Sequence, residues 1–291
     1  PQEFMCSLLN VFKNSQEDTT KYLQECRDMK LGVEFPDINT SEVNFSLGPE
    51  GQIRYGFSAI RNIGSDVMVN IIYQRPFSCL DEFLVKCQTV LNKKTFRALI
   101  FSGALDRLYP YRKSLLEYCN EEKKKIKKPS QTERLFDLSE LFFSQKIQGK
   151  LSKESFPLFE QLQKEKEFLG CYRSGHPLDT VKKDLEKWPD RRTIGSIVQE
   201  RDFIQNTPVK IIGIIEKIKK RMTKKTNRPM AFVECSDHSG NIEVVFFPDM
   251  YEKSLPCLIE GTILLVNGKV SLQNVTAQSI AVIKSVEKVL S

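Results

Sequence analysis

Along the first 120 residues, apolar side chains recur with the spacing of one buried helix face. Such stretches follow Ser65, a residue type suited to begin a helix, and occur again over 80–87, 96–100 and 112–119. Short polar turns separate them. The pattern predicts several amphipathic helices, and packing in a core is the expected role of almost every apolar residue in them.

From about residue 205 the apolar period changes to two, the period of half-buried strands. The predicted strands span 209–216, 230–235, 242–247, 261–270 and 275–283, with a helix-like stretch near 250–255. Five strands with a helical connector after the third match the layout of an OB fold, a small closed barrel. Another small β-barrel is the alternative, but the long connection after the first strand favours the OB fold.

Composition narrows the classes of function. The chain has 291 residues, with 44 Lys and Arg against 37 Asp and Glu, which gives a formal net charge of +7 and leans towards a polyanionic partner. No stretch approaches the roughly 20 apolar residues of a membrane helix, and no signal peptide layout is present. Eight scattered cysteines and two histidines offer no ligand spacing for zinc. We expect reduced thiols, a cytoplasmic location, and no metal or cofactor in this segment.

The segment 60–65 (IRNIGS) places a glycine immediately before a predicted helix. If Gly64 adopts a positive φ, successive backbone N–H groups can converge on one anion, and the helix N-terminus adds partial positive charge. Such a helix-hairpin-helix turn would hold a DNA phosphate without reading sequence. A second, degenerate copy could lie at 101–106 (FSGALD), and an ordinary helical turn is the alternative. The candidate duplex contacts are Arg61, Asn62, Ile63, Gly64 and Ser65.

The connection between the first two predicted strands, 217–228, carries seven basic residues and no acid. So many like charges repel one another unless a partner such as a nucleic acid backbone supplies counter-charge. OB domains bind single strands along this loop and the second and third strands, where aromatic rings can stack on bases. Packing in the core is the alternative for the two aromatic residues. The candidate single-strand contacts are Lys219, Lys220, Arg221, Lys224, Lys225, Arg228, Phe232 and Phe246.

Other stretches carry weaker signals. The run 121–128 (EEKKKIKK) indicates a solvated linker, and the apolar pairs over 129–143 either fold back on a core or form a peptide that inserts into a partner. His176, next to Pro177, is expected to be a hydrogen-bonded structural residue. No paired carboxylates, phosphate-binding loop or dinucleotide fingerprint is present, so the chain is expected to bind rather than catalyse.

Several blocks of the sequence resemble the alpha subunits of bacterial DNA polymerase III, the C-family of replicative polymerases. The blocks occur in the family's order and are 1–9 (PQEFMCSLL), 22–32 (YLQECRDMKLG), 36–41 (PDINTS), 53–64 (IRYGFSAIRNIG), 165–178 (EKEFLGCYRSGHPL) and 229–247 (PMAFVECSDHSGNIEVVFF). The resemblance covers most of the chain.

The resemblance implies an α+β multidomain chain, the C-terminal part of a DNA-directed DNA polymerase. The expected divisions are the end of the fingers domain (1–45), a tandem helix-hairpin-helix region (46–120), a linker (121–155), a helical connector (156–204) and a five-stranded OB-fold barrel (205–291). The palm, with its catalytic Mg²⁺, is expected upstream of this segment. The segment alone should therefore be inactive as a nucleotidyltransferase.

The resemblance also implies partners: duplex and single-stranded DNA, the sliding clamp and other replisome subunits. The family's clamp motif is a glutamine followed by a Leu-Phe pair, so Gln131, Leu135 and Phe136 are the candidates, at one residue more than the usual spacing. The stretch 138–142 (LSELF) has the spacing but lacks the glutamine. The alternative from another class is a non-polymerase protein with an OB domain and helix-hairpin-helix units, such as a helicase or ligase accessory module.

Overall fold

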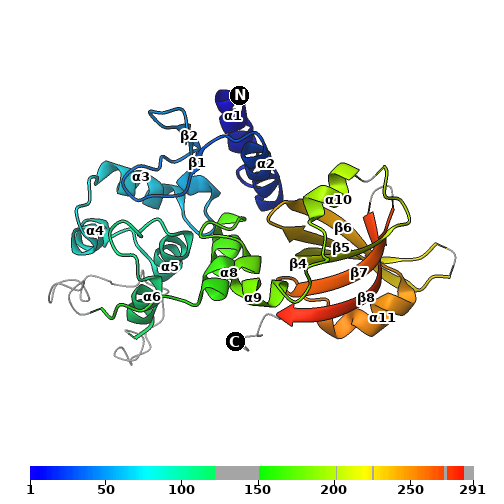
Figure 1. Cartoon of the computed structure of the whole chain (residues 1–291). Coiled ribbons are helices and arrows are strands. Elements are labelled where there is room, and N and C mark those ends of the chain that lie inside the picture. Colours follow the sequence, from blue (N-terminus) through cyan, green and yellow to red (C-terminus); the bar gives the residue numbers. More distant parts are fainter. Residues whose placement is uncertain (122–150, 201, 225, 272–273, 285–291) are drawn as a thin grey trace. The chain divides into compact units, whose positions relative to one another are not determined.

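The computed structural model describes residues 1–121, 151–200, 202–224, 226–271 and 274–284. They form two compact units, Pro1–Ser174 and Gly175–Ser291 (Figure 1). The first unit is mainly helical and the second is built on a barrel. This division confirms the predicted fold class, in which helices precede a β-barrel domain.

The first unit contains α-helices of 8–13 residues and one short 3₁₀ helix around a three-stranded sheet. The helices are α1 (Gln2–Phe12), α2 (Gln16–Asp28), η1 (Phe57–Ala59), α3 (Ser65–Tyr73), α4 (Leu80–Cys87), α5 (Lys93–Ser102), α6 (Arg112–Glu121) and α8 (Leu158–Leu169). The sheet has the order β1-β3-β2, from β1 (Val33–Glu34), β2 (Ser46–Leu47) and β3 (Ile53–Arg54). The helices predicted over 80–87, 96–100 and 112–119 are confirmed.

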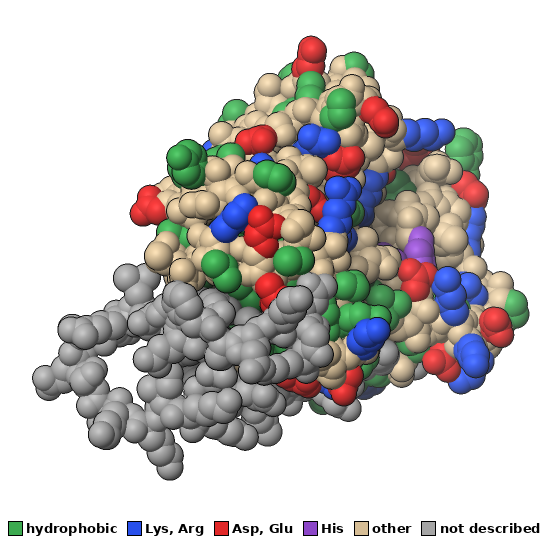
Figure 2. Space-filling model, turned by 90° about the vertical axis from the view of Figure 1, so that its left-hand side faces the viewer, with side chains coloured by type: hydrophobic (Ala, Val, Ile, Leu, Met, Phe, Trp, Pro, Cys, Tyr) green, Lys and Arg blue, Asp and Glu red, His purple; other side chains and the backbone are tan. Residues whose placement is uncertain are grey.

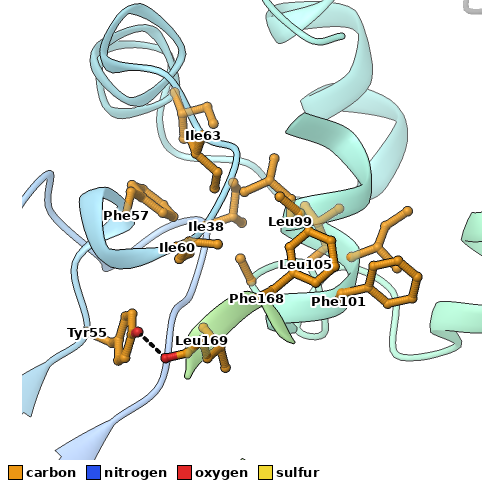
Figure 3. Close-up of a cluster of buried hydrophobic side chains, with 14 of the residues drawn as sticks. Ile38, Tyr55, Phe57, Ile60, Ile63, Leu99, Phe101, Leu105, Phe168 and Leu169 are labelled. Carbon is orange, nitrogen blue, oxygen red and sulfur yellow. Dashed lines mark hydrogen bonds between the residues drawn. The ribbon is translucent and has the colours of Figure 1, made fainter. Parts of the chain in front are cut away.

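One hydrophobic core joins these elements. The core runs from Met5 on α1 to Cys171 after α8, so the helix-hairpin-helix region and α8 share it. Figure 3 shows part of it, where Phe168 of α8 lies near Ile60 and the α5 side chains Leu99 and Phe101. The buried hydroxyl of Tyr55 donates to the carbonyl of Leu169 at 2.7 Å, which fixes the end of α8 against the sheet.

The second unit is a closed five-stranded barrel with the strand order β4-β5-β6-β8-β7. Its strands are β4 (Pro208–Met222), β5 (Pro229–Asp237), β6 (Gly240–Phe246), β7 (Ile263–Val270) and β8 (Asn274–Lys284). The helix α11 (Pro248–Ser254), followed by η4 (Leu255–Cys257), lies between the third and fourth strands. Before the barrel come η3 (Pro177–Val181), α9 (Lys182–Leu185) and α10 (Ile194–Glu200). The OB layout predicted from the pattern is confirmed.

The first strand is longer than predicted. β4 continues to Met222 and pairs with β5 down to Pro229, so most of the basic segment is a β-hairpin and only 223–228 is a turn. The prediction of a long loop was wrong: the apolar alternation gives way to lysines after residue 216, but the backbone pairing with β5 continues to Met222. We call the paired residues 217–222 and 229–234, with their turn, the arm.

Candidate nucleic-acid interface

The arm presents basic and aromatic side chains on one outer face. Its register pairs Lys219 with Phe232 and Arg221 with Met230. Ala231 lies in the barrel core, and because side chains alternate along a strand, Phe232 and Lys219 face outward. In Figure 1 the tip of the arm extends beyond the rest of the barrel. On this face Lys219 and Arg221 are exposed and Phe232 is partly exposed.

Four cations of the arm have no acidic partner among the residues that the structure describes. Lys219, Lys220, Arg221 and Lys224 are exposed, and within the described ranges the structure pairs none of them with an acid. Elsewhere, on the face drawn in Figure 2, basic and acidic side chains are interspersed. The arm therefore concentrates unneutralised positive charge, which is the electrostatic requirement for holding a polyanion. Lys225 lies outside the described residues.

Arg228 differs from the other cations of the arm. Its guanidinium contacts Asp249 at 2.8 Å and Glu252 at 3.0 Å, both on α11. The hydrogen bonds to Glu252 and Asp249 raise the pKa of Arg228. The sequence showed no acid within 217–228, but the fold brings these two from 21 and 24 residues further on. Arg228 thus ties the turn of the arm to α11 and is a weaker candidate for contacting nucleic acid.

The two candidate stacking residues differ in exposure to solvent. Phe232 is partly exposed on the outer face, next to Lys219. Phe246 is 0% exposed and belongs to the barrel core, so its assignment as a base-stacking residue was wrong. The next residue, Phe247, is 49% exposed and was missed. Alternation with the buried Val244 and Phe246 would have placed Phe247 outward, at the point where Pro248 ends the strand period.

The turn before α3 has a backbone different from the one expected. Gly64 is the residue preceding the helix and has φ −80°, whereas the positive φ falls on Asn62, at 70°. An asparagine tolerates this conformation, so the turn does not need the glycine for its φ. The side chain of Ser65 does not cap the helix. Ile63 is buried in the core, while Gly64 and Ser65, at the start of α3, are exposed.

A second helix N-terminus lies beside this turn. Asn92 caps α5 by accepting from the N–H of Thr95 at 2.9 Å, and the hydroxyl of Thr95 donates to the carbonyl of Asn62 at 3.3 Å. Lys93 and Lys94 occupy the first turn of α5. The sequence predicted this helix over 96–100 but not its start at Asn92, although an Asn-Lys-Lys sequence before an apolar stripe is a recognisable helix start. The starts of α3 and α5 are thereby linked.

The remaining residue of the turn, Arg61, is held on both its backbone and its side chain. Its N–H donates to the carbonyl of Phe168 at 3.0 Å, and its guanidinium donates to the Gln16 side chain at 2.9 Å. These bonds fix the turn to α8 and α2. The exposed part of Arg61 stays on the surface beside Asn62.

The turn at 101–106, predicted as a second, degenerate copy of the hairpin, is buried. Phe101, Ser102 and Leu105 are all buried in the core, so the turn offers no surface to a phosphate. Gly103 ends α5 with φ 74°, and a Cβ there would lie 1.6 Å from Arg173 and 2.3 Å from Arg112. The glycine is present for close packing against two guanidinium groups rather than for an anion.

Four further predictions concern other parts of the chain. Gln131, Leu135 and Phe136 lie outside the described residues. His176 is a structural residue, as predicted, because its Nδ1 accepts from the N–H of Leu178 at 3.2 Å at the start of η3. Across the described ranges, no cluster of His, Cys, Asp and Glu is arranged to hold a metal ion. The described helices include none long and apolar enough to cross a bilayer.

Two family models match separate parts of the chain. A model of the helix-hairpin-helix motif matches residues 30–115, which include the turn before α3 and the start of α5. A model of OB-fold nucleic acid binding domains matches residues 209–283, which cover the barrel and the arm. Both matches agree with the elements that the structure contains.

Sequence comparison finds relatives named DNA polymerase III subunit alpha. The protein of Saccharopolyspora erythraea is 33% identical over 287 residues, that of Borreliella burgdorferi 32% over 285, and that of Bacillus subtilis 31% over 280. The matches cover 92–93% of this chain and 24% of each relative, so the chain spans about a quarter of their length. The resemblance to the alpha subunits of bacterial DNA polymerase III is thereby confirmed over most of the chain, with a helix-hairpin-helix region followed by an OB-fold domain.

Proposed function

We propose that this chain is the DNA-holding C-terminal portion of a replicative DNA polymerase alpha subunit. In this proposal the turn before α3 contacts the phosphates of duplex product, and the arm guides single-stranded template. The observation that carries it is that Lys219 and Arg221, exposed and without an acidic partner among the described residues, lie on the same face of the arm as the ring of Phe232. Nucleotidyl transfer is proposed to belong to the palm of the longer polypeptide, with its Mg²⁺.

The duplex contact is proposed for the residues 61–65 together with the adjoining start of α5. The exposed residues Gly64 and Ser65 at the start of α3, with the nearby Lys93 and Lys94, suit a phosphate, which carries no base identity. Ile63 contributes from the core by anchoring the turn. Asp66, in the first turn of α3, lowers the local attraction and favours a weak contact.

The arm can be tested by charge removal on its outer face. In a double variant, Lys219→Gln with Arg221→Gln, the affinity for a single-stranded oligonucleotide should fall, and the slope of log affinity against log salt should flatten by about 0.7 for each cation lost. Phe232→Ala should cost about 1–3 kcal/mol of binding without flattening the slope, because stacking releases no counterions.

Arg228→Gln is the matched control, since this cation is already bound by Asp249 and Glu252. Its salt slope should stay close to that of the unmodified chain. Fluorescence anisotropy at two salt concentrations measures all of these quantities. An unchanged slope in the double variant, or an equal change in the control, would reject the arm as the binding surface.

Clamp binding is proposed for the peptide containing Gln131, Leu135 and Phe136. Replacing Leu135 and Phe136 by alanine should abolish binding to a sliding clamp and leave DNA affinity unchanged. Unchanged clamp affinity would reject this register of the motif.

The enzymatic and cellular parts of the proposal rest on the relatives. Fusing a palm-containing upstream segment from an alpha subunit should yield primer extension, which the chain alone should lack. No extension from the fusion would favour a non-polymerase nucleic-acid-binding protein. We propose a reducing, cytoplasmic location, because all eight cysteines are free thiols.

A further inference from the structure

The covalent joint between the two compact units lies at Ser174–Gly175. On its upstream side, the carboxylate of Glu165 holds the chain by its backbone. One oxygen accepts the N–H groups of Arg173 and Ser174, both at 2.8 Å, and the other accepts the hydroxyl of Ser174 at 2.5 Å. The last two residues of the first unit are therefore fixed to α8.

This upstream attachment is rigid because the Glu165 side chain is itself held by other side chains. Its side chain is 0% exposed and pairs with Arg112 at 2.7 Å, and Arg112 pairs with Asp106 at 2.6 Å. A buried carboxylate that loses its partners leaves an uncompensated charge, so the arrangement resists partial opening. Residues 173 and 174 are thus part of the first unit up to their last peptide group.

On the downstream side, a second carboxylate repeats this role. Asp179 accepts the N–H of His176 at 2.8 Å, and the ring of His176 accepts the N–H of Leu178. Pro177 follows directly, with a fixed φ. The other oxygen of Asp179 contacts His238 on the turn between β5 and β6, at 3.0 Å, which ties the segment to the barrel. The chain is therefore fixed again from His176 onward.

Gly175 is the single residue between the segment held by Glu165 and the segment held by Asp179. It is exposed, has φ 137°, and makes no backbone hydrogen bond with any residue that the structure describes. This conformation is accessible almost only to glycine. Hinges are typically a few terminal positions that absorb the dihedral change while their neighbours stay rigid.

We propose that Gly175 is a one-residue pivot about which the barrel unit reorients relative to the helical unit. Glu165 and Asp179 hold the chain on either side and confine the motion to this residue. The pivot goes beyond the proposed binding of nucleic acid and does not depend on it. It would let the arm change direction without deforming either core.

Backbone ¹⁵N relaxation and residual dipolar couplings of the whole chain, without nucleic acid, test the pivot. Residues 173, 174 and 176 should share the rigid order parameters of their units, and the two units should require different alignment tensors. A single tensor that fits both units would overturn the proposal. So would mobility centred on residues other than Gly175.

A glycine pair supplies the matched variants. Gly175→Ala restricts the pivot and should reduce the difference between the two alignment tensors. Gly240→Ala changes another glycine of positive φ, at 157°, in a barrel turn with open space around it, and should leave the tensors as they were. Equal effects of the two substitutions would overturn the pivot, as would no effect of the first.

The role of Glu165 in holding residues 173 and 174 is tested by Glu165→Gln, which keeps the volume of the side chain but removes its charge. Mobility should then spread upstream to Arg173 and Ser174, while the far-UV circular dichroism stays helical. Should this variant lose its helical signal, Ser174→Ala removes only the shortest bond to Glu165 and should produce the same spread to a smaller extent. Mobility still confined to Gly175 in the folded variant would contradict the role of Glu165.

Discussion

At the scale of single residues, Gly103 is a position where glycine is required for two reasons, its backbone conformation and the space around it. Its φ of 74° is left-handed, and a side chain would displace the guanidinium groups of Arg173 and Arg112. Gly51 has nearly the same φ, 79°, but open space around it. The two positions separate the cost of conformation from the cost of lost packing.

We predict that Gly51→Ala lowers the free energy of unfolding by about 1 kcal/mol, the cost of a left-handed alanine. Gly103→Ala should lower it by at least about 3 kcal/mol, because the ion pairs of a buried arginine are also disrupted. Urea unfolding followed by far-UV circular dichroism measures both values. Equal losses would mean that the guanidinium groups move aside without cost.

The lowered pKa of Asp179 predicts that the stability of the barrel unit depends on pH. Burial opposes ionisation, but the N–H of His176, His238 and Lys182 outweigh it and lower the pKa of Asp179 from 3.8 to about 2. Because the unfolded chain holds the proton more tightly, the stabilisation is full above pH 4 and is lost as the pH falls towards 2.

The stability difference between the unmodified chain and Asp179→Asn should therefore be on the order of 2 kcal/mol above pH 4 and should shrink towards pH 2. Fluorescence of Trp188, the only tryptophan and a residue of this unit, follows the unfolding. A difference that stays constant between pH 5 and 2 would contradict the lowered pKa of Asp179.

At the scale of elements, the sequence predicted the barrel better than the surface that it carries. The alternation of apolar positions located all five strands and the helix after the third. It could not show that the lysine-rich segment pairs with β5, because exposed strand positions have no apolar period. Nor could it show that Asp249 and Glu252 neutralise Arg228, since these contacts depend on tertiary folding.

The helical region shows the same limit. Helix positions followed from apolar stripes, but the sequence pattern placed a second hairpin at 101–106, where the structure has a buried turn. The start of α5, which does adjoin the first turn through Thr95 and Asn62, was missed. Glycine marks both turns equally in sequence, and only burial separates a surface turn from a core turn.

The start of α3 allows a prediction that separates binding from stability. Ser65→Glu places an additional negative charge in the first turn, which stabilises a helix by about 0.3–1 kcal/mol but repels a phosphate. Duplex affinity should fall while the thermal midpoint stays level or rises. Ser65→Ala, the control, should leave duplex affinity unchanged. Unchanged duplex affinity in the glutamate variant would remove this turn from the proposed contact surface.

At the scale of the whole molecule, two separate hydrophobic cores predict two unfolding transitions. The helical core ends at Cys171, and the barrel core begins at Ile194. Trp188 reports the barrel unit, whereas far-UV circular dichroism reports mainly the helices. We predict that the two probes give different urea midpoints, which a two-state protein would not.

Core variants should move one transition each. Leu99→Ala removes a fully buried side chain of the helical core and should lower the free energy of unfolding of that unit by about 2–5 kcal/mol. Only the urea midpoint followed by circular dichroism should then fall. Phe246→Ala should lower only the tryptophan midpoint, by about 3–5 kcal/mol. Coincident midpoints that shift together would show that the units unfold as one.

The central claim is that the outer face of the arm holds a single nucleic acid strand. It is tested most directly by mapping amide chemical shifts of the whole chain during titration with a single-stranded oligonucleotide. We predict that the largest changes fall on Lys219, Arg221 and Phe232, and that they weaken as salt rises. Changes confined to other faces of the barrel, or no changes at low salt, would contradict the account.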